Sequence, residues 1–327
     1  MIVGDIALVV ALVTFSLCEE YYQFFLSLGL LGGFAAACIW TTTLVTTGHW
    51  FSKHPGIATA PVTTSGPIGG ICFPVLFDAL VPRMGFGWTV RIIALICLIM
   101  SIVALALMRT RLPASGKIKW NTNWKIFTEK EFGLTVIAVS WIESSFLVPL
   151  AYITPYALSI NMSSSTAYLL LPIMNAAQIP GRLIPGLLAD RWGRFNVIIL
   201  CSLLCAISVL VLWMFATTEA AVIAFAIIFG FLSATASSLA PVCISQLCTT
   251  EDYGSECGTA YLYLSPAVLA GNPIAGQLIT FSNQPNGTSA SDYRSLILTC
   301  RLTYLCSALF FMLARIIGGG TSIKKKY

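Results

Sequence analysis

The sequence predicts an all-α, polytopic membrane protein. Hydrophobic residues make up 57% of its 327 residues and charged residues only 9%, and the mean hydropathy is +0.86. Globular cores of this size cannot bury so much apolar surface, so the surplus must face lipid. Apolar runs long enough to cross a hydrocarbon core about 30 Å thick recur along the whole chain.

Glycines, prolines and charged residues separate ten such runs. The first run is short, and we expect it to be a retained span, because Asp5 near its start replaces the basic region of a signal peptide. The expected spans are residues 2–18, 22–47, 56–80, 88–108, 132–157, 166–188, 195–216, 219–247, 258–281 and 296–317.

Basic residues are divided unevenly between the two sets of loops. One set holds only Arg83 and Arg294. The other holds twelve, namely Lys53, Arg109, Arg111, Lys117, Lys119, Lys125, Lys130, Arg191, Arg194, Lys324, Lys325 and Lys326. Because cytoplasmic loops are rich in Lys and Arg, we expect both termini in the cytoplasm. Separately, we expect the plasma membrane rather than an internal one. The triplet beginning at Asn286 is then an outward-facing candidate for glycosylation, although such triplets are common by chance.

The longest polar interval divides the chain unequally. We expect an incomplete N-terminal bundle of four spans (1–108), a basic cytoplasmic linker (109–131), a C-terminal six-helix bundle (132–317) and a basic cytoplasmic tail (318–327). Many transporters are built from two equivalent halves. On that plan, two spans are missing before the first one seen here.

The stretch Gly181–Phe195 (GRLIPGLLADRWGRF) concentrates charge at the end of an apolar helix. Gly186, Asp190, Arg191, Gly193 and Arg194 form a candidate gating loop in which Gly193 lets the chain reverse. Asp190 could accept hydrogen bonds from the N-terminus of a neighbouring helix, or pair with an arginine. Such a contact could latch two helices in one conformation. The alternative is topological, with two arginines keeping the loop in the cytoplasm.

The segment GLLADRWGR (186–194) resembles the loop signature of the major facilitator superfamily, roughly G-x-L-a-D-r-x-G-r. The strings YYQFFLSLGLLGG, SGPIGGICFPVL, GFGWTVRII, LLLPIMNAAQIPGRLIPGLLADRWGRFNVII and AGNPIAGQLI resemble, in this order, its fungal monocarboxylate-porter-like branch. The resemblance implies twelve helices in two bundles that work by alternating access. This chain supplies ten, so we expect that it lacks the first two family helices.

The resemblance also implies secondary transport of a small organic solute. Animal monocarboxylate porters have an Asp four residues before the Arg of their eighth helix, where this chain has Gln178 before Arg182. The family's Lys in the first helix falls in the missing region. Proton-coupled monocarboxylate transport is therefore not inherited automatically. The alternative function is that of a transport-inactive truncated paralogue, or of a membrane sensor or scaffold.

Glu143 lies deep within its apolar run, near the expected bilayer midplane. An ionised carboxylate there is costly, so it should be protonated, paired or in contact with water. One hypothesis is a substrate or proton site. The alternative is a neutral Glu hydrogen-bonded to Ser140, Ser144 or Ser145.

Arg182 lies nearly two turns before the end of its helix, among prolines and glycines that make that helix irregular. If it faces a cavity, it would attract an anionic solute; otherwise it snorkels to the headgroups. Asn175 and Gln178 share its helix face and could line the same wall, or simply bond to neighbouring helices. Arg91 and Arg301 are expected to snorkel outward.

The sequence offers no residues for an enzyme. It contains no phosphate-binding loop, no G-x-S-x-G, no H-E-x-x-H and no dinucleotide fingerprint, so no cofactor is expected. His49 and His54 lack the neighbours of a metal site, and most of the eleven cysteines fall inside apolar runs as small hydrophobic residues. The basic residues form no stripe that nucleic acid would require. The expected partners are a small solute and the lipid bilayer.

Overall fold

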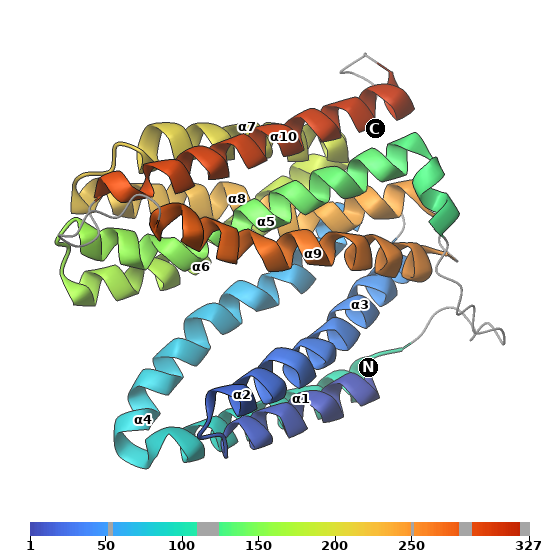
Figure 1. Cartoon of the computed structure of the whole chain (residues 1–327). Helices are drawn as coiled ribbons and strands as arrows, with labels where there is room; N and C mark the ends of the chain where they lie inside the picture. The colour runs from blue at the N-terminus through green and yellow to red at the C-terminus, as the bar shows by residue number, and fades with distance from the viewer. Residues whose placement is uncertain (52–54, 110–123, 250–251, 281–289, 321–327) are drawn as a thin grey trace. The chain divides into compact units, whose positions relative to one another are not determined.

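The computed structural model describes residues 1–51, 55–109, 124–249, 252–280 and 290–320, which are almost entirely helical and contain no strand (Figure 1). The predicted helical fold is therefore confirmed. The chain divides into two compact units: residues 1–52 with 69–118, and residues 53–68 with 119–327. The first residues of the helix beginning at Pro55 thus belong to the second unit. The predicted division at a basic linker stays a prediction, since most of that linker lies outside the described residues.

The first unit is built from three helical segments and the later part of a fourth. These are α1 (Ile2–Phe15), α2 (Tyr21–Phe24) running through a π-helical segment (Phe25–Gly32) into α3 (Gly33–Trp50), and α4 (Pro55–Leu107) from residue 69 onward. A Cβ added to Gly4 would lie only 2.8 Å from Cys38 Cβ, so α1 and α3 pack closely. Phe15 packs against Phe24 and Phe86, in each case with 5.4 Å between ring centroids.

A single residue breaks α4 into the two helical runs that were predicted there. Gly85 has φ 77° and ψ 169°, a conformation essentially confined to glycine. Figure 1 shows the sharp turn in α4. Beyond it, the guanidinium of Arg91 lies 5.0 Å from the ring centroid of Trp88, and its Nε donates to Ser16 Oγ at 3.2 Å.

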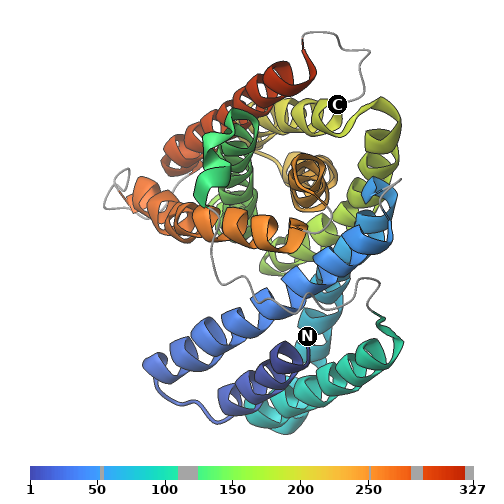
Figure 2. The same cartoon turned by 90° about the vertical axis from the view of Figure 1, so that its right-hand side faces the viewer.

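The second unit surrounds a central helix. Its elements are the start of α4 (residues 55–68), a 3₁₀ turn (Trp124–Thr128), α5 (Lys130–Ser159), α6 (Ser164–Trp192), α7 (Arg194–Ser208) with a π-helical turn (Val209–Trp213), α8 (Glu219–Leu247), α9 (Tyr253–Thr280), a second 3₁₀ turn (Ala290–Tyr293) and α10 (Arg294–Gly319). Helix α8 is seen end-on in the middle of this unit in Figure 2. Stacked rings of Trp213, Phe225 and Phe229 extend along its N-terminal half.

Glycines bring α6 and α8 into backbone contact. A Cβ on Gly181 would collide with the Phe231 carbonyl, and a Cβ on Gly230 would lie 2.7 Å from the Met174 carbonyl. Small residues permit this close approach of membrane helices. Arg182, the residue after Gly181, is therefore held against α8.

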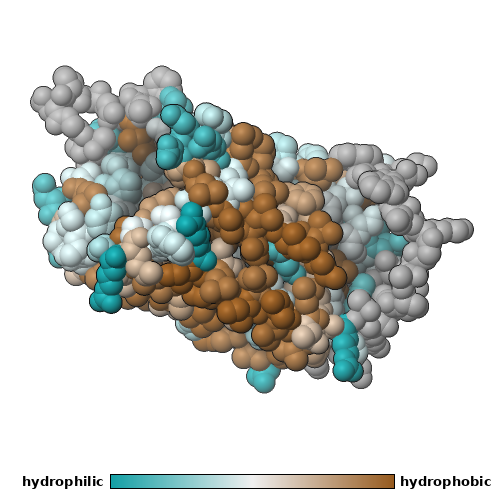
Figure 3. Space-filling view, turned by 90° about the horizontal axis from the view of Figure 1, so that it is seen from below, coloured by the Kyte–Doolittle hydropathy of each residue, from teal (hydrophilic) through white to brown (hydrophobic). Residues whose placement is uncertain are grey.

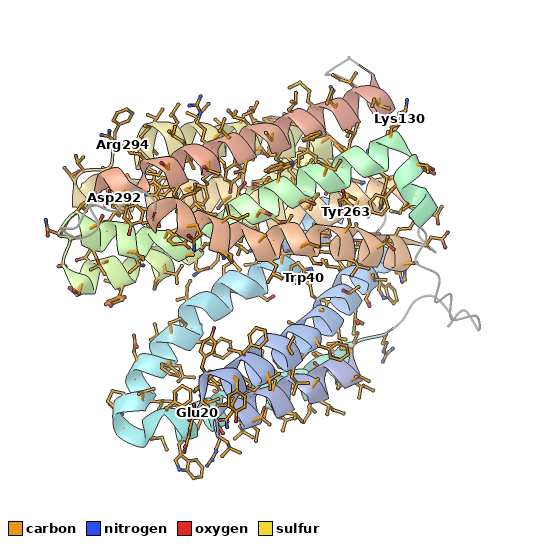
Figure 4. The ribbon with its side chains drawn as sticks, in the orientation of Figure 1. Glu20, Trp40, Lys130, Tyr263, Asp292 and Arg294 are labelled. Carbon is orange, nitrogen blue, oxygen red and sulfur yellow. The ribbon has the colours of Figure 1, made fainter. Side chains whose placement is uncertain are left out.

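Six of the described helices are long and apolar enough to cross a membrane: Tyr21–Trp50, Pro55–Leu107, Lys130–Ser159, Arg194–Trp213, Glu219–Leu247 and Arg294–Gly319. The space-filling view shows a broad apolar surface with hydrophilic residues gathered toward its edges (Figure 3). In the stick view, Lys130 and Arg294 lie at the starts of their helices and Glu20 lies where α1 gives way to α2 (Figure 4). Charge at helix ends and apolar middles are typical of helices in a bilayer.

Candidate functional site

Arg182 is the centre of the polar cluster in the second unit. Its side chain is only 5% exposed. Nη1 donates to the Thr63 carbonyl in the first turns of α4, and Nη2 donates to Gln178 Oε1 at 3.3 Å and to Ser237 Oγ of α8 at 3.2 Å. Nε has no hydrogen-bond partner among the described residues. The buried guanidinium therefore donates hydrogen bonds to neutral oxygens from three helices.

The local sequence explains this position. Gly181 admits the backbone of α8, and the next residue in α6 is the arginine, so its side chain reaches Ser237. The guanidinium is thereby held between helices. This placement differs from the snorkelling alternative, in which the side chain would extend toward the headgroups.

Glu143 lies on α5, half-buried, and interacts electrostatically with Arg182. The alternative expected from the sequence is a neutral Glu143 that is hydrogen-bonded to one of three nearby serines. The hydroxyls of Ser140, Ser144 and Ser145 donate to the carbonyls of Val136, Ser140 and Trp141 in their own helix. These three hydroxyls thus donate to backbone carbonyls. The charged group that interacts with the Glu143 carboxylate is Arg182.

The two amides predicted to accompany Arg182 behave differently. Gln178 is buried and accepts from the guanidinium, while its Nε2 has no partner in the described part of the chain. Asn175 is half-buried, and its Nδ2 donates to the Leu171 carbonyl of its own helix at 3.1 Å. The structure therefore groups Gln178 with Arg182 and leaves Asn175 about two helical turns from Arg182, bonded within its own helix.

The gating loop lies at the end of α6 and contacts the start of α4. Gly193, with φ 96° and ψ 139°, makes the turn between α6 and α7. Asp190 Oδ1 accepts from the Gly56 amide at 3.2 Å, and Oδ2 accepts from the Ile57 amide at 2.9 Å. The carboxylate therefore satisfies two free N–H groups at the positive end of α4.

The arginines of the loop have other surroundings. Arg194 Nη1 donates to Gln246 Oε1 at 3.4 Å, near the end of α8. Arg191 is exposed. Of the interactions proposed from the sequence, the contact of Asp190 with a helix N-terminus is the one that the structure contains.

Further contacts connect Asp190 with Arg182 along the same face of α6. A Cβ on Gly56 would lie 2.6 Å from the Gly186 carbonyl, and a Cβ on Gly186 would lie 2.8 Å from the Gly56 carbonyl. Positions 182, 186 and 190 are spaced four apart and so share one side of the helix. We call this set of contacts, Asp190 with Gly56 and Ile57, Gly186 with Gly56, and Arg182 with Thr63, the α4–α6 seam.

A cavity of about 600 Å³ lies elsewhere in the second unit, between α5, α9 and α10. Its walls are mostly apolar and include Trp141, Tyr263 and Thr303, while Glu143 and Arg182 do not line it. This cavity is thus separate from the charged cluster. Asn286, the candidate glycosylation site, lies outside the described residues.

Sequence reasoning missed the partners that come from other helices: Thr63, Ser237, Gly56 and Ile57. One signal was present for Thr63. Its carbonyl would normally accept from residue 67, and residue 67 is proline, which has no N–H.

Comparisons with known proteins decide the family. A family model described as the Major Facilitator Superfamily matches residues 1–271 and 133–320. The chain belongs to the major facilitator superfamily. Its relatives include the MFS transporter asaE of Aspergillus flavus, 31% identical over 95% of this chain and 70% of that protein. The riboflavin transporter MCH5 of Saccharomyces cerevisiae is 30% identical over 96% of this chain and 64% of that protein.

Other members of this family that resemble the chain are named as efflux proteins. Among solved structures, the superfamily transporter FucP in its outward conformation has a TM-score of 0.71 at 14% identity, covering 96% of this chain and 82% of that one. The resemblance to the superfamily seen in the sequence is thus confirmed. The relatives are transporters rather than enzymes, and the monocarboxylate-porter type stays a prediction.

Proposed function

We propose that this superfamily member is a secondary transporter that moves a small organic solute by alternating access, and that Arg182 attracts an anionic group of that solute. The observation that carries the proposal is a buried guanidinium held by neutral oxygens, with one N–H unpartnered among the described residues. Burying a charge without a close counter-ion is costly. A carboxylate or similar group of the solute would complete the site.

Glu143 adds a route to proton coupling. The solute anion and the ionised carboxylate of Glu143 would compete for the single positive charge of Arg182. Two negative charges beside one cation are unfavourable in a low-dielectric interior. Protonation of Glu143 would relieve that repulsion, so that solute and proton bind together.

The α4–α6 seam is the element proposed to alternate between states. Asp190 and the glycine contact hold the end of α6 against the start of α4. Opening the seam would release both helix ends, and closing it would restore two charge-assisted hydrogen bonds. This supports the latch interpretation of the loop over a purely topological role.

The experiment is transport by the purified protein in proteoliposomes, with lactate and riboflavin as probes and with or without an imposed pH gradient. We expect Arg182→Ala to abolish transport of an anionic probe, and Glu143→Gln to remove its dependence on the gradient. Arg301→Ala, on α10, is the matched control and should transport normally. Unchanged transport in both site variants would exclude these residues from binding and coupling. Absence of transport by the unmodified protein for every probe would favour a sensor or scaffold instead.

We also infer that both termini are cytoplasmic and that the plasma membrane is the site of action. The support for the orientation is the excess of Lys and Arg in one set of loops; the choice of membrane is part of the proposal and does not follow from it. A C-terminal epitope tag should be reached by antibody only after cells are permeabilised. Labelling of intact cells would reverse the assigned orientation.

A further inference from the structure

We propose that Pro67 is a positioning residue for Arg182, acting through the backbone carbonyl of Thr63. The consequence for transport rests on the proposed function, whereas the structural link does not. The link joins a proline in α4 to an arginine more than a hundred positions later in the chain.

The first step is the missing donor. In an α-helix the carbonyl of residue 63 accepts from the N–H of residue 67. Pro67 has no N–H, so the Thr63 carbonyl has no helical partner at that position. Thr63 is fully buried and Pro67 is buried as well. A buried carbonyl requires a hydrogen-bond partner.

The second step is the donor that replaces it. Arg182 Nη1 donates to this carbonyl. The approach is open because Gly66 has no side chain: even an added Cβ would lie 3.8 Å from Nη1. Pro67 therefore leaves the Thr63 carbonyl without its helical donor, and Gly66 leaves space for the guanidinium beside that carbonyl.

The third step concerns what this contact does for the site. With Nη1 on Thr63 and Nη2 on Gln178 and Ser237, the guanidinium has a fixed orientation within the α4–α6 seam. An anion that draws Arg182 toward itself takes the donor away from Thr63. Solute binding and loosening of the seam are then linked through one side chain, because they use the same N–H groups.

The test measures how readily Arg182 reacts with phenylglyoxal, an arginine-specific reagent, in the purified protein, with modification located by peptide mass spectrometry. Arg191 on the same helix is exposed and provides the internal reference. Pro67→Ala restores an N–H to the Thr63 carbonyl and should raise the relative reactivity of Arg182 about fivefold, the factor expected from losing one net hydrogen bond. Pro67→Ser restores the same N–H and should behave alike.

Pro61→Ala is the matched control. It makes the same substitution in the same helix at an exposed position, six residues earlier, and should leave Arg182 as protected as in the unmodified protein. Equal reactivity in the unmodified protein and both Pro67 variants would overturn the proposal, as would an equal increase in Pro61→Ala. Because proline-to-alanine changes favour a helix interior, folding should be retained, and gel filtration checks this.

A transport readout separates this inference from the proposed function. If an anionic probe is transported, Pro67→Ala should change KM for it by more than it changes the maximal rate, and should leave a neutral probe unaffected. Equal effects on both probes would mean a general packing role for Pro67. Failure of transport in the unmodified protein would count against the proposed function and leave the modification result standing.

Discussion

The carboxylate of Asp190 lies 2.9 Å from the backbone amide of Ile57, which is 133 positions away in the chain. One carboxylate at the end of α6 thus caps the start of α4, where free N–H groups and the helix dipole favour negative charge. The contact gives the charged loop a physical role that its composition alone left open.

Replacing Asp190 should weaken this cap. We expect Asp190→Asn to lower the stability of the purified protein by about 1 kcal/mol, since the charge is lost while an oxygen acceptor remains. A thermal melt in detergent would measure the change. Arg191→Gln, at the exposed neighbouring position, should melt like the unmodified protein. Equal melting of Asp190→Asn and the unmodified protein would show that the cap contributes nothing.

Adding a methyl group to the seam should be more damaging. Gly186→Ala would place a Cβ 2.8 Å from the Gly56 carbonyl, and overpacking of this kind costs about 1–3 kcal/mol. We expect lower thermal stability and slower transport. The control is Gly258→Ala in α9, where nothing lies within 4 Å of the added carbon. Equal melting temperatures for the two variants would show that the contact between Gly186 and Gly56 tolerates an added methyl group.

The neutral amide at position 178 should matter for solute charge. Gln178→Glu would place a carboxylate where the guanidinium now donates to an amide oxygen. The resulting pair would compete with an anionic solute, and we expect its affinity to fall about tenfold, equivalent to ~1.4 kcal/mol. Asn175→Asp, whose amide bonds to its own helix, is the control and should have a smaller effect. A competition assay against an anionic and a neutral probe would distinguish a charge effect from misfolding, which would weaken both.

Cys248, just after α8, should be an unreactive thiol at neutral pH. Burial, together with the nearby Glu256 carboxylate, raises the pKa of Cys248. Only the thiolate is alkylated, so the rate should still climb with pH at pH 9, whereas an ordinary thiol with a pKa of about 8.5 is levelling off. Alkylation by iodoacetamide, followed by peptide mapping across pH, measures this.

A charge-removing variant tests the cause of that shift. Glu256→Gln should lower the pKa of Cys248 and speed its alkylation at pH 8. Glu219→Gln, at the far end of α8, should not. A rate that levels off below pH 9 in the unmodified protein would contradict the assigned environment.

The sequence predicted the helices well because each apolar run carries its own evidence. Every expected span coincides with a described helix, and the two runs within α4 are separated at Gly85. Composition also indicated that lipid must cover much of the surface. Neither the helix positions nor the lipid-facing surface depends on knowing which helices pack against one another.

The candidate site was only partly predictable for the same reason. Periodicity placed Gln178 and Arg182 on one face of a helix, and the structure joins them. It placed Asn175 there too, but a short amide side chain can reach the carbonyl four residues back, and it does so. Ser237 and Thr63 come from other helices, and helix pairing depends on close contacts such as those at Gly181 and Gly230.

Gly85 has a practical consequence for anyone probing this protein. The chain passes from one long apolar run to the next through a single residue whose backbone angles exclude side chains, and Phe86 directly after it packs among other rings. Residues 82–86 are exposed, but helix continues on both sides of Gly85, so this turn leaves little extended backbone for a protease to cut or an epitope tag to enter. Insertions there should abolish expression, and accessibility mapping must use the other connections.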